Sequence, residues 1–348
     1  MSESVSLGNV VDALAAGEDV FTRWGGKARD VMVANPAFVT LDHTMDQTRR
    51  LMDKHGVRHM PLVEDGAVLG IISRRDLSRI ATTTMCTDDA TDADRLILSQ
   101  RLGGLYTPNP VTANGEASVF SLVQTMLQQQ IDCVIIVGPA KELLGLVTSS
   151  TVLQWIVRLE WLGRLRAALG TPAPARPTAD VLYAQVVAHV SDVCTPKAPL
   201  ALVTTAIGAV VKQMQQSGGR HTLVLDDAGV LAGIVSDRDI MRKTPTHWRT
   251  ALTRAPKTGQ RDHFHLHFED PEVQEFLKQP VSTVMTPGPM VVKHDLGTAA
   301  LAKLFLDMQI GGAPVQGPDG KIVAIVTETD LLRAFVRLRE DGAGRRPR

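Results

Sequence analysis

Apolar residues in this chain fall into short runs that alternate with amphipathic stretches. Between residues 44 and 55 the apolar positions can share one face of a helix, and Gly56 follows where that helix would end. Residues 60–63 and 68–72 are two apolar runs separated by a Glu-Asp-Gly turn, which is typical of a strand pair. A further helix is expected from Ser73. The pattern therefore predicts the order helix, strand, turn, strand, helix.

The same order of signals returns in the second half of the chain. Helices are expected at 206–216 and 297–308, and a glycine pair comes shortly after each. The strands expected after these helices are 222–225, 230–235, 314–315 and 321–326. Short apolar strands that alternate with helices indicate a small α/β unit that is buried on both faces. A unit of roughly 50–55 residues is marginally stable alone, so we expect two units to pack together.

One seven-residue motif marks the end of each unit. Gly-Ile-Ile-Ser-Arg-Arg-Asp at 70–76 returns as Gly-Ile-Val-Ser-Asp-Arg-Asp at 233–239 and as Ala-Ile-Val-Thr-Glu-Thr-Asp at 324–330. A weaker copy at 145–151 has Thr151 in place of the aspartate. An extended start also repeats about thirty residues upstream of each copy. These starts lie at 36–40, 110–112, 202–204 and 290–292. Four copies of one unit explain the pattern.

The motif and its spacing resemble the cystathionine β-synthase (CBS) domain. The resemblance covers most of the chain and implies four CBS-like α/β repeats that pack as two tandem Bateman modules in a flat disk. The expected organisation is an N-terminal helical arm 1–26, repeat one 27–80, repeat two 105–160, a linker 161–189, repeat three 190–244, a connection 245–279, repeat four 280–338 and a flexible tail 339–348.

The motif residues suit a sugar and an anion. A hydroxyl where a strand turns into a helix can cap free N–H groups, and a carboxylate is favoured in the first helical turn. The resemblance assigns ribose binding to the carboxylates Asp76, Asp239 and Asp330, with hydroxyl contacts from Ser73, Ser236 and Thr327. The alternative is an ordinary helix cap with no ligand. Because repeat two lacks the aspartate, its site is expected to be empty or to bind something else.

Phosphate groups require cations, and the repeats differ in them. Arg58 with His59, and Arg220 with His221, stand just before a strand, where family members place basic residues that face phosphates. Arg75 and Arg238 precede the ribose-type aspartates and are further candidates, because a guanidinium group suits phosphate oxygens. A solvated arginine and a histidine at a strand edge is an equally good interpretation for the two Arg-His pairs. The resemblance also suggests that Thr40 and Thr204 contact adenine, although threonine is common in strands anyway.

Composition mainly excludes classes of protein. The chain has 348 residues, with 37 Lys and Arg against 37 Asp and Glu, so nothing in the net charge favours nucleic acid or an anionic membrane. No apolar run approaches the roughly 18 residues of a membrane-spanning helix. The three cysteines are scattered, which fits free thiols in the cytoplasm. Motifs of serine hydrolases, phosphate loops and zinc proteases are absent, so we expect no enzyme, catalytic cofactor or metal.

Two segments allow other interpretations. His263, His265 and His267 would share one face of a strand and could hold a metal, although a polar strand face is the simpler interpretation. The basic connection 242–261 could bind nucleic acid, but Trp248 is its only aromatic stacking partner and a solvated linker is more common.

The expected function is that of a regulatory sensor. Adenosine-containing ligands, with AMP, ADP and ATP as leading candidates, would bind between repeats and change their relative orientation. A homodimer and an unidentified effector protein are the expected partners. The alternatives are a scaffold that binds no ligand and a nucleic-acid binder that uses the basic connection.

Overall fold

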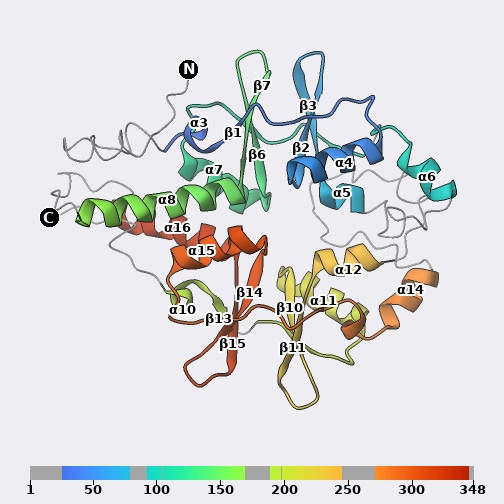
Figure 1. Cartoon of the computed structure of the whole chain (residues 1–348), viewed down its shortest axis with the longest axis vertical. Helices are drawn as coiled ribbons and strands as arrows, with labels where there is room; N and C mark the ends of the chain where they lie inside the picture. The colour runs from blue at the N-terminus through green and yellow to red at the C-terminus, as the bar shows by residue number, and fades with distance from the viewer. Residues whose placement is uncertain are drawn as a thin grey trace.

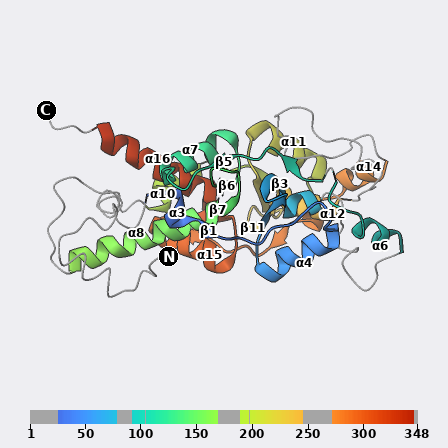
Figure 2. The same cartoon turned by 90° about the horizontal axis from the view of Figure 1, so that it is seen from above.

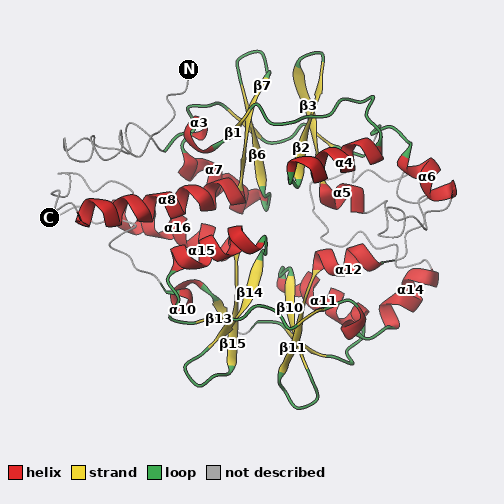
Figure 3. Ribbon diagram, viewed as in Figure 1, coloured by secondary structure: helices red, strands yellow, loops and turns green. Residues whose placement is uncertain are grey.

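A computed structural model describes residues 26–78, 92–103, 105–168, 189–196, 198–244 and 271–344. Strand pairs project toward two opposite rims, and helices fill the space between the two halves of the chain (Figure 3). Seen edge-on, the molecule is flattened (Figure 2). Among the described residues, no helix is long and apolar enough to cross a membrane.

The first half of the chain contains repeats one and two, which lie side by side (Figure 1). Repeat one consists of α3 (Ala28–Val31), β1 (Val33–Ala34), α4 (Met45–His55), β2 (His59–Glu64), β3 (Ala67–Ser73) and α5 (Arg74–Ser78). Helix α6 (Asp92–Leu98) lies in the connection after repeat one and packs on the core of that repeat. Repeat two consists of β4 (Thr107–Pro108), β5 (Thr112–Ala113), α7 (Val119–Gln129), β6 (Cys133–Val137), β7 (Leu143–Thr148) and α8 (Ser149–Ala168).

The second half repeats this order, and it confirms the predicted mixed α/β units. Repeat three consists of α10 (Val190–Val193), β8 (Thr195–Pro196), β9 (Leu200–Leu202), α11 (Ile207–Ser217), β10 (His221–Leu225), β11 (Leu231–Ser236) and α12 (Asp237–Lys243). Helix α14 (Pro271–Lys278) lies in the connection before repeat four and packs on the core of repeat three. Repeat four consists of the 3₁₀ helix η2 (Val281–Thr283), β12 (Thr286–Pro287), β13 (Val292–Lys293), α15 (Thr298–Met308), β14 (Gly312–Gln316), β15 (Ile322–Thr327) and α16 (Glu328–Gly344).

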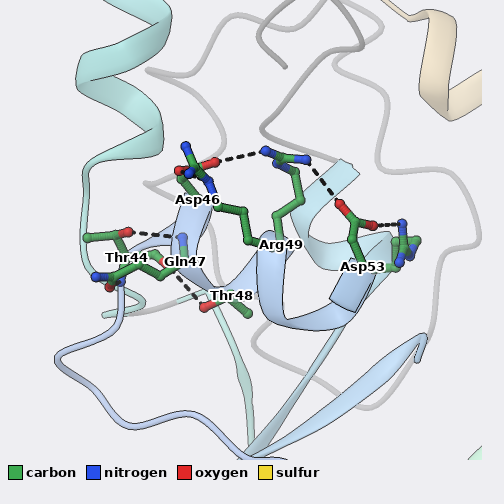
Figure 4. A network of polar contacts seen from close by, with 8 residues as sticks. Thr44, Asp46, Gln47, Thr48, Arg49 and Asp53 are labelled. Carbon is green, nitrogen blue, oxygen red and sulfur yellow. Dashed lines mark hydrogen bonds and ion pairs between the residues drawn. The ribbon is translucent and has the colours of Figure 1, made fainter. Parts of the chain in front are cut away.

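Local signals explain where the first long helix of repeat one begins and ends. In α4, Thr44 Oγ1 accepts a hydrogen bond from the Gln47 N–H, and the Thr44 N–H donates to Gln47 Oε1, which makes a capping box. The helix ends at Gly56 in the left-handed conformation. On the polar face of α4, Arg49 bonds both Asp46 and Asp53, each at 3.0 Å (Figure 4).

Each sheet is completed by a two-residue strand from the other repeat of its half. β1 of repeat one pairs antiparallel with β7 of repeat two, and β4 of repeat two pairs with β3 of repeat one. In the second half, β8 pairs with β15 and β12 pairs with β11. The sequence does not predict these four strands, because two residues are too few to show an alternating pattern. The exchange joins the two repeats of each half.

Two kinds of interface hold the molecule together. Within each half, strands pack on strands: Cys133, Ile135 and Leu146 of repeat two contact Val68 and Ile71 of repeat one. The corresponding cluster in the second half joins Leu223 and Ile234 of repeat three to Ile325 of repeat four.

Between the halves, helices pack on helices. Repeats two and four share one buried core, in which Trp155 of α8 meets Phe335 of α16 edge to face with ring centroids 5.6 Å apart. Repeats one and three keep separate cores. One chain therefore supplies both halves of the disk.

Several expected boundaries differ from the structure. Helix α8 continues through Ala168, past the end expected for repeat two, and α16 continues to Gly344, so residues 339–344 are helical rather than part of a tail. Helix α14 begins at Pro271, inside the expected connection, as the proline and the following Glu272 favour. The expected N-terminal arm up to residue 25, the three-histidine segment and the basic connection beyond Thr244 lie outside the described residues.

Candidate ligand site at the strand-to-helix turns

The turn from each second hairpin strand into the next helix fixes the predicted carboxylate. In repeat three, Asp239 Oδ2 accepts hydrogen bonds from the Ser236 N–H at 2.9 Å and from the Ser236 hydroxyl at 2.6 Å. The Asp239 N–H in turn donates to Ser236 Oγ at 3.2 Å. The same contacts join Ser73 with Asp76, and Thr327 with Asp330. In three repeats, one carboxylate oxygen therefore completes a capping box with the serine or threonine whose hydroxyl caps the helix.

Repeat two builds the same turn without a carboxylate. The Thr148 N–H donates to Thr151 Oγ1 at 3.0 Å, and the Thr151 N–H donates to Thr148 Oγ1 at 3.2 Å. The Thr151 hydroxyl thus takes the place of the carboxylate as the acceptor for the Thr148 N–H. Repeat two therefore keeps the local fold and lacks the charged acceptor, so folding of the turn does not by itself require an aspartate.

The second carboxylate oxygen has different surroundings in repeats three and four. Asp330 Oδ1 accepts from the Thr195 hydroxyl at 3.1 Å and lies 3.3 Å from Arg333 Nη1, and Asp330 is only 5% exposed. Among the described residues, none donates a hydrogen bond to Asp239 Oδ1. Thr195 comes from the exchanged strand β8 of repeat three. The sequence does not predict this contact, because 135 residues separate Thr195 from Asp330.

One backbone hydrogen bond recurs in all four repeats and places the charged side chains at equivalent points. The first amide of the closing helix donates to the carbonyl of a residue just before the first hairpin strand. The donor–acceptor pairs are Arg74 with Arg58, Ser149 with Asp132, Asp237 with Arg220, and Glu328 with Gly311. In Figure 1 the inner ends of β2, β6, β10 and β14 face the middle of the molecule. The four repeats therefore present these positions to one another.

Two predicted phosphate-binding arginines pair with carboxylates from the opposite half. Arg58 Nη2 of repeat one lies 3.8 Å from Glu328 Oε1 of repeat four. Arg220 Nη1 of repeat three lies 3.4 Å from Asp132 Oδ2 of repeat two, and Arg220 Nε lies 3.7 Å from Asp237 Oδ2. The sequence pattern indicates the arginines but not these partners, because the pairs form only when distant repeats pack together.

The charged groups at the centre perturb one another. Burial raises the pKa of Glu328, whose side chain is 18% exposed, while the nearby Arg58 opposes that rise. Partial desolvation lowers the pKa of Arg238, and the positive charges of Arg58 and Arg220 act in the same direction. These mutual effects show that Arg238, Arg58 and Glu328 belong to one electrostatic group that spans both halves.

Comparison with known proteins assigns the repeats. Four stretches match the family model of the CBS domain, at residues 28–82, 102–158, 190–245 and 281–337. Together they cover more than half of the chain. The chain belongs to the CBS-domain family. Its four CBS domains form two CBS pairs, so each half of the molecule is one pair.

Individual proteins resemble parts or all of this CBS protein. It is 26% identical over 164 residues to the CBS domain-containing protein CBSX2 of Arabidopsis thaliana, a match that spans 44% of this chain and 65% of that protein, just under two thirds of its length. CBSX2 has a solved structure in complex with AMP, which is 22% identical and covers 43% of this chain and 98% of that one at a TM-score of 0.32. The crystal structure of protein MJ1225 from Methanocaldococcus jannaschii covers 89% of this chain and 99% of that one at 17% identity, with a TM-score of 0.58. The likeness to MJ1225 shows the shared fold.

The two predicted histidines occupy equivalent places in the first and third CBS repeats. His59 lies opposite Ser73, and His221 lies opposite Ser236, each at the start of its hairpin. A Cβ added to Gly312 would lie 3.5 Å from His221 Cε1, so the imidazole of repeat three abuts repeat four. Burial lowers the pKa of His221, which favours its neutral form.

The predicted adenine contacts are placed differently from the expectation. Strand β9 ends at Leu202, so Thr204 lies in the following turn, where it is exposed. The turn forms there because the Thr205 hydroxyl accepts a bond from the Leu202 N–H at 2.9 Å. Thr40 is likewise outside a strand, and both its N–H and its hydroxyl contact His43 Nδ1. Their assignment to adenine stays a prediction.

Arg75 and a possible metal site are the remaining candidates. The side chain of Arg75 lies outside the described part of the structure, although its backbone belongs to α5. Within the described residues, no group of three or more histidine, cysteine, aspartate or glutamate side chains is arranged to hold a metal ion. The ligand-binding roles of all the predicted site residues stay predictions.

Proposed function

We propose that this CBS protein is a regulatory protein that binds adenosine-containing ligands between its repeats. The observation that carries the proposal is the turn of repeat three, where Asp239 Oδ2 completes the capping box with Ser236 and Oδ1 has no hydrogen bond among the described residues. A carboxylate oxygen held at a fixed place can accept from ribose hydroxyls. Arg238 precedes this aspartate, and Arg220 and Arg58 are close enough to Arg238 to perturb its pKa.

The proposed ligands are AMP, ADP and ATP, and AMP comes first because the relative CBSX2 has been solved in complex with AMP. A ligand that contacts two repeats favours the relative orientation that fits it, and so changes the surface offered to an effector protein. The proposal assigns the chain no catalysis and no catalytic cofactor. Energy sensing, a homodimeric state and a cytoplasmic location complete the proposal. The two described cysteines, Cys133 and Cys194, are both free thiols, which supports the location.

Replacement of Asp239 by asparagine tests the site. The amide oxygen keeps the shape of the cap but removes the charge that accepts ribose hydroxyls, so Asp239→Asn should weaken AMP binding by at least about tenfold, the equivalent of one lost charge-assisted bond. Isothermal titration calorimetry on the full chain measures this change, and circular dichroism verifies the fold.

Repeat two offers the matched control. Thr151→Ala removes the hydroxyl that accepts from the Thr148 N–H at the equivalent turn and should cost about 1 kcal/mol of stability, while AMP binding stays unchanged. Equal affinities of wild type and Asp239→Asn would contradict the proposed role of Asp239. If wild type binds none of the three nucleotides, the chain is a scaffold without such a ligand.

A further inference from the structure

Six charged side chains meet where the four repeats converge, and we name them the central charge cluster. Each repeat contributes at least one of them, either from just before its first hairpin strand or from the first turn of its closing helix. Its members are Arg58, Arg220, Arg238, Asp132, Asp237 and Glu328. Three guanidinium groups thus face three carboxylates, and their formal charges cancel when all six groups are ionised.

The important feature of this cluster is its two ion pairs between the halves of the molecule, Arg58 with Glu328 and Arg220 with Asp132. Repeat two has Asp132 where repeats one and three have Arg58 and Arg220, and repeat four has Glu328 at its helix start. Each of these acids lies within 4 Å of an arginine from the other half. The carboxylates therefore stand where additional phosphate oxygens would have to lie in order to reach the same guanidinium groups.

A long polyphosphate chain does not suit arginines that already have carboxylate partners. One phosphate can share a guanidinium group with a carboxylate, because each guanidinium group has five N–H donors. Each further phosphate adds negative charge beside Asp132 and Glu328 in a partly desolvated centre, where like charges repel more strongly than in water.

We infer that Asp132 and Glu328 limit the ligand to an adenosine derivative with no phosphate or a single phosphate, and so discriminate against ATP. This inference rests on the proposed function, and it narrows the ligand class of the same site. Asp132 and Glu328 are specificity-determining residues in this account. Their role is to occupy arginines that would otherwise attract a triphosphate.

The double variant Asp132→Asn with Glu328→Gln tests the inference, because it keeps the side-chain shapes and removes both charges. Calorimetry of the full chain in magnesium-free buffer uses four probes: adenosine, AMP, ATP and inorganic tripolyphosphate. Wild type should bind AMP more tightly than ATP and should not bind tripolyphosphate measurably. The variant should bind tripolyphosphate and should gain at least about tenfold in affinity for ATP relative to AMP.

A control variant separates local from global charge. Glu142→Gln with Asp319→Asn changes the net charge equally, in the hairpin loops at the two rims, and should behave as wild type. The inference would be overturned if wild type bound ATP more tightly than AMP. It would also be overturned if Asp132→Asn with Glu328→Gln left the relative affinities for AMP and ATP unchanged. Absence of adenosine, AMP and ATP binding would instead refute the proposed function, and the tripolyphosphate comparison would still decide whether the carboxylates exclude polyphosphate.

Discussion

At the scale of single residues, His221 shows how the meeting of repeats changes the chemistry of a side chain. Burial is the main cause that lowers its pKa, and Arg220 and Arg238 lower it further. Asp237 and Asp239 act in the opposite direction. The folded protein therefore binds a proton at His221 less readily than the unfolded chain, whose histidines titrate near pH 6.5.

This difference predicts a loss of stability in mild acid. Above pH 6.5 His221 is neutral in both the folded and the unfolded state, and its contribution to the free energy of unfolding is fully present. Below pH 6.5 the unfolded state takes up the proton first, so the free energy of unfolding falls until the pH passes the folded pKa. The loss amounts to about 1.4 kcal/mol for each unit between the two pKa values.

Urea unfolding of wild type and His221→Gln between pH 7.5 and 5 measures the effect, and the variant should show the smaller pH dependence. His55→Gln, at an exposed position at the end of α4, provides the control. Identical slopes for wild type and His221→Gln would show that the burial of His221 does not influence stability.

The sequence allowed prediction of the residues that recur at fixed spacing, and not of their partners. Ser236 and Asp239 stand three residues apart, so their contact follows from helix geometry alone. The contact of Thr195 with Asp330 and that of Arg58 with Glu328 depend on how separate repeats pack, and no local pattern carries that information.

At the scale of elements, the glycine of the repeated motif permits the exchange of short strands. A Cβ at Gly233 would lie 2.6 Å from Met285 Sδ and 2.9 Å from the Thr286 carbonyl oxygen on β12. Gly70 and Gly145 are equally close to the strands that pair with them. Repeat four instead has Ala324, which is buried opposite Pro196.

Gly233→Ala should therefore destabilise the protein. The new methyl group must displace Met285 or the backbone of β12, and overpacking of this kind costs about 1–3 kcal/mol. Chemical denaturation measures the change. Ala324→Gly is the matched control in repeat four and should cost no more than about 1 kcal/mol, the usual effect of glycine in a strand. A Gly233→Ala protein as stable as wild type would show that the close approach is not a constraint.

Prediction of the elements succeeded where the pattern was long. The helices that became α4, α11 and α15 carry apolar positions at helical spacing over three turns, and each hairpin contains a recognisable turn. The first strand of repeat three differs from its predicted range. Strand β9 covers Leu200–Leu202 rather than 202–204, because Val203 and Thr204 belong to the turn that follows.

At the scale of the whole molecule, the two CBS pairs are joined unequally. Repeats two and four share a continuous apolar core through α7, α8, α15 and α16. Repeats one and three have separate cores, and among the described residues they approach through α5 and α12, the helices that begin beside Asp76 and Asp239. We expect a ligand bound between α5 and α12 to change the relative orientation of repeats one and three more easily than that of repeats two and four, because less apolar surface has to move.

Native mass spectrometry of the full chain, titrated with AMP, tests the central claim most directly. If the motif carboxylates hold the ligand, wild type should carry bound AMP with at most three molecules per chain, since repeat two has Thr151 in place of aspartate. The triple variant Asp76→Asn, Asp239→Asn and Asp330→Asn should carry none while circular dichroism shows it folded. A folded triple variant that binds AMP as wild type does would contradict the account.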